Sequence, residues 1–125
     1  MLLAYDIDAD GKSDITALLT GDAEAEALDQ LLNGNIISQA MILKVGHHGS
    51  EGAVTSQQLR QLDTRIALIS VGENNRFGHP SSKVIQTLEN QGIQTYRTDL
   101  NGDVSITMNK DGFRVHCDTI IDRYS

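Results

Sequence analysis

Three polar loops in the sequence each follow an apolar stretch and carry residues that can bind a metal ion or an anion. The loops hold Asp22, the adjacent pair His47-His48, and His79. A carboxylate and neutral imidazoles are common ligands of zinc-like metals. Because ligand chemistry in α/β proteins collects where strands end, these residues are predicted to lie at one edge of a sheet. The pattern predicts a metal or anion site there.

Asp22 and the histidine pair each allow two interpretations. Asp22 could be the N-cap of the helix that follows it, or a carboxylate that binds or bridges metal ions. Adjacent histidines cannot share one face of a strand. In the loop bounded by Gly46 and Gly49, however, one imidazole can point into a site while the other braces it. Structural and ligand roles for the pair are about equally supported.

The loop around His79 has the composition of an anion site. Asn75, Arg76 and His79 suit a phosphate group, and a helix opening at Pro80 or Ser81 would add its positive N-terminal dipole. An ordinary polar turn is the alternative.

An acidic loop near the start of the chain suggests a different chemistry. Carboxylates occur at Asp6, Asp8, Asp10 and Asp14, with a glycine at the bend, similar to the Asp-x-Asp-x-Asp-Gly calcium loop. The flanks read as strands and not as the helices of an EF-hand. A calcium-binding hairpin is the functional interpretation, and a solvated turn is the simpler one.

The apolar periodicity predicts a layered α/β domain with a hairpin at each end. Helices are expected at Ala23–Leu32, Thr55–Leu62 and from Pro80 or Ser81 to Gln91. Strands are expected at Leu2–Ile7, Ile15–Leu19, Met41–Val45, Ile66–Val71, Gln94–Arg97, Val104–Met108 and Phe113–Cys117. Asn101-Gly102 and Asp111-Gly112 read as hairpin turns between the last three strands.

Composition limits the domain organisation and the classes of function that the chain can have. The 125 residues make one domain, and the net charge of −7 argues against a general nucleic-acid-coating role. The single cysteine, Cys117, allows no internal disulfide, and both it and His116 are predicted to be structural, on opposite faces of a strand. No apolar run reaches the roughly 18 residues of a membrane span, and the first residues do not read as a signal peptide.

Five short blocks in series resemble a known family. They are Leu18–Asp22, Leu43–Ser50, Ile69–Gly72, Asn75–Pro80 and Tyr96–Asp99 with Gly102. Their order is similar to that in the metallo-β-lactamase-like domain of the ComEC-type competence proteins, which take up DNA, and of related hydrolases. The resemblance covers nearly the whole chain. It implies an αββα sandwich, of which residues 1–125 form about the C-terminal half.

The resemblance also implies metal-assisted hydrolysis of a phosphodiester, with zinc or manganese as the metal. Asp22 matches an aspartate that bridges two metal ions, and the histidine pair matches the last metal-binding histidine, with His48 favoured over His47. His79 is expected near the substrate phosphate, which makes Asp22, His48 and His79 the catalytic set.

Ser50, Asn75 and Arg76 are expected to contact the substrate together with His79.

One departure from the family changes the expected activity. The principal motif, His-x-His-x-Asp-His, is absent, because the only histidines are 47, 48, 79 and 116. The chain is therefore expected to be an inactive part of a hydrolase. Its partners would be the N-terminal half or membrane domain of a parent protein and a phosphodiester such as DNA, at the extracellular or periplasmic face of a membrane. A half-sandwich would expose an apolar sheet face, which predicts a homodimer.

Overall fold

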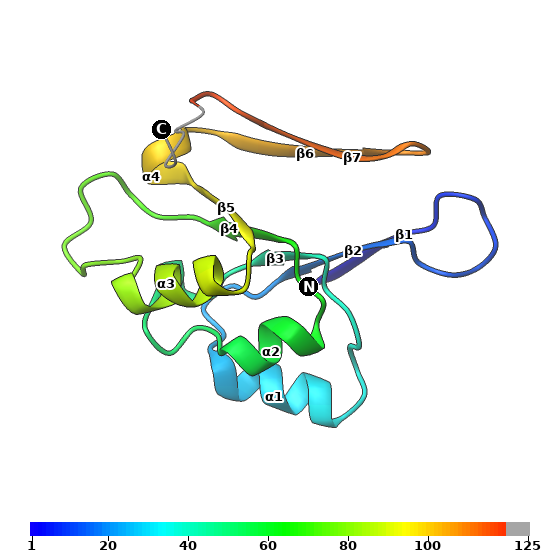
Figure 1. Cartoon of the computed structure of the whole chain (residues 1–125), viewed down its shortest axis with the longest axis horizontal. Coiled ribbons are helices and arrows are strands. Elements are labelled where there is room, and N and C mark those ends of the chain that lie inside the picture. Colours follow the sequence, from blue (N-terminus) through cyan, green and yellow to red (C-terminus); the bar gives the residue numbers. More distant parts are fainter. Residues whose placement is uncertain (120–125) are drawn as a thin grey trace.

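A computed structural model describes residues 1–119 (Figure 1). The strands are β1 (Leu2–Tyr5), β2 (Ile15–Leu19), β3 (Ile42–Lys44), β4 (Ile66–Ile69), β5 (Gln94–Arg97), β6 (Val104–Asn109) and β7 (Gly112–Cys117). The α-helices are α1 (Ala25–Asn33), α2 (Ser56–Gln61), α3 (Ser82–Asn90) and α4 (Thr98–Asn101). A short 3₁₀ turn, η1 (His47–Gly49), follows β3.

The first five strands form one sheet in the order β1-β2-β3-β4-β5. β1 is an antiparallel edge strand, and the other four strands run parallel to one another. Helices connect these parallel strands, and α1, α2 and α3 all lie on the same face of the sheet (Figure 1). Such an arrangement follows when successive parallel neighbours are joined by crossovers of one hand. The carboxyl ends of β2, β3 and β4 consequently meet at one edge.

The main core lies between the sheet and the three helices. Each longer helix places leucine or valine four residues apart on its inner side, as Leu28 and Leu32 do in α1 and Val84 and Leu88 do in α3. This is the helical spacing of a buried stripe. Gln58 of α2 is also buried, and its Nε2 donates to the Ala25 carbonyl at 2.6 Å, which ties α2 to α1.

The β6–β7 hairpin covers the opposite face of the sheet (Figure 1). Apolar residues of the sheet, including Ile42 and Ile66, pack against alternate residues of the hairpin, among them Ile106 and Val115. The expectation of a bare sheet face is therefore wrong. The chain supplies its own cover, which removes the physical reason given for a homodimer.

Most of the expected elements are confirmed, including the hairpins at both ends. The structure places the N-caps of α2 and α3 at Thr55 and Ser81. The hairpin expected at Asn101-Gly102 is wrong, because β5 and β6 belong to different sheets. The Asn101 side chain instead accepts from the Arg97 amide at 2.8 Å and donates to the Thr119 carbonyl at 2.9 Å. A mixed α/β fold with a mostly parallel sheet is thus confirmed, whereas the αββα sandwich stays a prediction.

Within residues 1–119, none of the helices combines the length and apolar character needed to cross a membrane.

Candidate functional site

The three predicted loops lie against one another at the carboxyl ends of β2, β3 and β4. The His47 amide donates to the Gly21 carbonyl at 3.0 Å, which joins the first loop to the second. The Ser81 amide donates to the Gly49 carbonyl at 2.9 Å, which joins the second loop to the third. The convergence expected from the sequence is therefore present in the fold.

Two glycines allow the loops to approach so closely. A Cβ atom on Gly46 would lie 1.8 Å from the Ala23 carbonyl oxygen, so the backbones of the first two loops are in direct contact. A Cβ atom on Gly49 would lie 2.7 Å from Cβ of Pro80. Neither position has room for a side chain.

The backbone of the histidine pair is strained. His47 has φ of 47° and His48 has φ of 55°, both in the left-handed region that disfavours residues with a Cβ atom. Each such residue costs on the order of 1–3 kcal/mol and persists only where the surrounding structure enforces it. Strain of this kind concentrates at functional sites, so it supports a functional role for the pair.

Glu24 is a site residue that the sequence did not single out. Its Oε1 atom lies 2.9 Å from Nδ1 of His47 and accepts a hydrogen bond from the Ser50 hydroxyl at 2.7 Å. The Ser50 hydrogen bond and then the His47 contact hold the pKa of Glu24 below its usual value. Glu24 was overlooked because it is one of several acids in a helical stretch, and its partners lie 23 and 26 residues away.

Both histidine rings are held through Nδ1, which leaves Nε2 available. Nδ1 of His48 lies 2.7 Å from the Ser70 carbonyl oxygen, and the Glu24 carboxylate holds Nδ1 of His47. Because these oxygens only accept, each Nδ1 carries a proton, and in the neutral ring Nε2 is then the free lone pair. Metal-binding histidines are oriented in this way by carboxylates and carbonyls.

Asp22 is exposed and is not the helix N-cap, because that position belongs to Glu24. It lies in a shallow open depression lined by Asp22, Glu24, Glu26, Ala27, Gln30, His47 and Gly52. His47 therefore faces the same depression as Asp22, whereas His48 does not line it. Asp22, His47 and His48 do not bring three ligand atoms within 4.8 Å of one another, so metal binding by this set stays a prediction.

The third loop brings His79 to the histidine pair. The ring centroids of His79 and His47 are 5.7 Å apart. The predicted substrate contacts differ in availability: Arg76 is exposed, but the Asn75 amide is hydrogen-bonded to the His79 backbone in both directions. Ser50 is buried, and its hydroxyl donates to Glu24. Substrate binding by these four residues stays a prediction.

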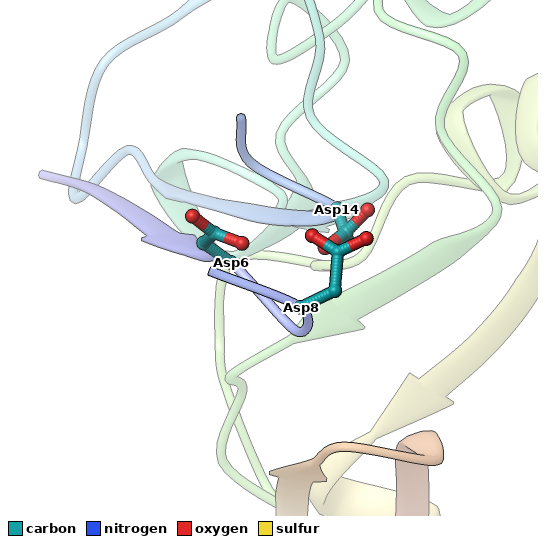
Figure 2. Close-up of side chains that lie close together, drawn as sticks. All are labelled: Asp6, Asp8 and Asp14. Carbon is teal, nitrogen blue, oxygen red and sulfur yellow. The ribbon is translucent and has the colours of Figure 1, made fainter. Parts of the chain in front are cut away.

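The acidic loop connects β1 to β2. It therefore lies at the amino-terminal end of β2, whereas the Asp22 site lies at the carboxyl end of that strand. One carboxylate oxygen from each of Asp6, Asp8 and Asp14 lies within 4.8 Å of the other two, and within residues 1–119 no other group of three acids, histidines or cysteines does so (Figure 2). The fourth predicted residue, Asp10, is not in the group. Oδ1 of Asp6 is buried without a hydrogen-bond partner.

His116 is exposed and Cys117 is half-buried on β7, which confirms that they face opposite sides of the strand.

Three curated proteins with related sequences bear on the family. The chain is 44% identical over 87 residues to ComE operon protein 3 of Bacillus subtilis (strain 168), a match that covers 70% of this chain and 11% of that protein. It is 30% identical over 119 residues to Competence protein ComA of Neisseria gonorrhoeae, covering 86% of this chain and 17% of that protein. It is 30% identical over 106 residues to Recombination protein 2 of Haemophilus influenzae, covering 85% and 13%.

These similarities support a relationship to the ComEC-type, competence-related proteins, as the motif series predicted. The chain spans 11% to 17% of the length of these relatives. No protein-family profile matches the chain.

Proposed function

We propose that this chain forms one side of the metal site of a phosphodiesterase or nuclease that acts in competence-linked DNA uptake. The observation that carries the proposal is the packing of three loops at one sheet edge, with two strained histidines held through Nδ1. The relatives supply the context, because two are named as competence or ComE operon proteins and a third as a recombination protein.

The donors of the site fit a zinc or manganese ion in kind but not in number. Asp22 and Nε2 of His47 would be the ligands from this chain, and Glu24 would orient the His47 ring. A bound metal lowers the pKa of a coordinated water and stabilises the charge that develops on a phosphodiester. A hydrolytic site needs about three protein ligands, so other ligands would come from residues outside this set. This assignment favours His47 where the sequence favoured His48.

The remaining roles belong to residues at the rim of the site. Arg76 would pair with a substrate phosphate, and His79 would donate to a phosphate oxygen from its position beside His47. The site would operate as part of a larger, membrane-associated uptake protein, on the extracellular or periplasmic face, with DNA as the phosphodiester.

Metal binding tests this proposal directly. We expect titration calorimetry to show that zinc or manganese binds less tightly to Asp22→Asn and to His47→Ala than to the wild-type chain. Glu24→Gln should weaken binding by about 10–100-fold, which is the usual effect of losing a group that orients a ligand. His116→Ala is the matched control, because His116 is exposed on β7 away from the site.

Circular dichroism would establish that each variant is folded. Equal metal affinities for the wild-type chain, Asp22→Asn and His47→Ala would sink the assignment.

A calcium site in the acidic loop is a second candidate function. The observation that favours it is the buried Oδ1 atom of Asp6, which has no hydrogen-bond partner while the carboxylates of Asp8 and Asp14 lie close by (Figure 2). An unpaired buried oxygen is costly unless a cation or another donor reaches it. Calcium prefers such carboxylate oxygens.

Two substitutions in the same loop separate a calcium site from a solvated turn. Asp8→Asn should weaken calcium binding at least about tenfold, because it removes a charged ligand. Asp10→Asn changes the net charge equally but lies outside the three-carboxylate group, so it should have a much smaller effect. Calorimetry with calcium and with magnesium measures both. An equal loss of calcium affinity in the two variants, or no calcium binding by the wild-type chain, would contradict the proposed calcium site.

A further inference from the structure

Phe77 is an aromatic side chain that the fold leaves in solvent. Its exposed fraction is 81%, the highest among the large hydrophobic residues that the structure exposes. Single exposed apolar residues are common and by themselves carry no meaning. This one is notable for its position in the His79 loop and for its immediate neighbour, Arg76, which is also exposed.

The Phe77 ring belongs to a row of rings that leads into the candidate site. It stacks on His79 with the centroids 6.2 Å apart and the planes inclined by 21°. The row continues from His79 to His47 at 5.7 Å and from His47 to His48 at 6.4 Å. Phe77 is therefore at the outer end of a row of rings that passes through His47, which lines the same depression as Asp22.

An exposed aromatic ring beside an arginine matches the chemistry of a single-stranded nucleic acid. Proteins that hold single-stranded nucleic acids stack bases on such rings, while nearby cations contact the backbone. Among residues 1–119, the structure records no carboxylate partner for Arg76, whereas Lys83 and Arg97 are paired with Glu51 and Asp99. A base within a duplex is already stacked on its neighbours, so only an unpaired base offers its face to Phe77.

We propose that Phe77 is a base-stacking platform that seats one base of a single-stranded polynucleotide and so directs the adjoining phosphodiester towards His79 and His47. Arg76 holds the backbone next to the stacked base. This inference rests on the proposed function for the location of the reacting phosphodiester. The stacking itself does not need a metal ion, so it can be tested separately.

The test is the binding of a fluorescently labelled single-stranded DNA of about 12 nucleotides, within the usual site size for such proteins, by anisotropy at low salt with EDTA present. Phe77→Ala should weaken binding by about 5–100-fold, the usual effect of losing one base stack, and Phe77→Tyr should bind like the wild type. Ile36→Ala is the matched control, because Ile36 is also exposed but lies between α1 and β3.

A strand with abasic positions identifies the stacked group. The wild-type chain should bind it as weakly as Phe77→Ala binds the normal strand, and Phe77→Ala should show no further loss. The proposal is overturned if the wild-type chain does not bind single strands, if Phe77→Ala binds them normally, or if removing the bases changes nothing. Because EDTA is present, these outcomes are independent of the metal titrations, so failure of either proposal is recognised without the other.

Discussion

Replacing Gly46 with alanine should lower the free energy of unfolding by about 3 kcal/mol or more, at or beyond the upper end for overpacking. The added Cβ atom would lie 1.8 Å from the Ala23 carbonyl oxygen, which is backbone and cannot rotate away. Gly46 has φ of −69° and ψ of 158°, a conformation that alanine adopts freely. The loss of stability would therefore come entirely from the steric clash, which pushes the histidine loop away from the Asp22 loop. Urea unfolding followed by circular dichroism measures it.

Gly72→Ala is the control for this substitution. Gly72 follows β4 in the chain, does not have positive φ, and would meet nothing within 4 Å of an added Cβ atom. We expect its unfolding free energy to stay within about 0.5 kcal/mol of the wild type, as for most surface substitutions. A similar loss of unfolding free energy in Gly46→Ala and Gly72→Ala would mean that the contact between Gly46 and Ala23 does not hold the loops together. If Gly46→Ala remains folded, it should also bind zinc or manganese less tightly.

Gly49→Ala should destabilise the chain by about 2–5 kcal/mol, from two sources. The residue has φ of +79°, and a left-handed conformation costs a non-glycine residue about 1–2 kcal/mol. The added Cβ atom would also lie 2.7 Å from Cβ of Pro80, an overpacking contact that adds about 1–3 kcal/mol. Moving Pro80 would displace the loop that carries Phe77 and His79. Urea unfolding gives the stability, and the anisotropy assay gives the effect on single-strand binding.

Gly78→Ala separates the two sources. Gly78 has φ of +69° but would meet nothing within 4 Å, so its substitution carries only the conformational cost. The difference between Gly49→Ala and Gly78→Ala then measures the contact with Pro80. If the two variants are equally stable, the histidine loop and the His79 loop are not held in place by that contact.

Local sequence signals predicted most of the secondary structure. The four-residue spacing of Leu28 and Leu32 marks a helix with one buried side, and the apolar run around Leu43 marks a buried strand. Thr55 and Ser81 are N-caps because their hydroxyls accept from a backbone amide three residues later. Such signals depend only on residues within about one helical turn, so the sequence contains them fully.

Interactions between distant residues were not predictable in the same way. Nothing near Glu24 in the sequence indicates that it will contact His47 and Ser50. Asn101-Gly102 is a second example, because it has the composition of a hairpin turn, but Asn101 is the last residue of α4 and Gly102 is the C-cap of that helix. The β6–β7 hairpin was predicted from its turn, but its packing over the apolar sheet face, in place of pairing with β5, depends on residues far apart in the sequence.

The sequence by itself determined the order of the elements and the identity of the three polar loops, because alternation, helical spacing and capping are local properties of a chain. Only the tertiary structure decided which of their side chains meet. The parallel order of β2, β3 and β4 brings their carboxyl ends together, and the absence of a Cβ atom at Gly46 and Gly49 allows the loops to touch. This contact places His47 against Glu24, in the depression that Asp22 also lines, and it places Phe77 at the outer end of the row of rings.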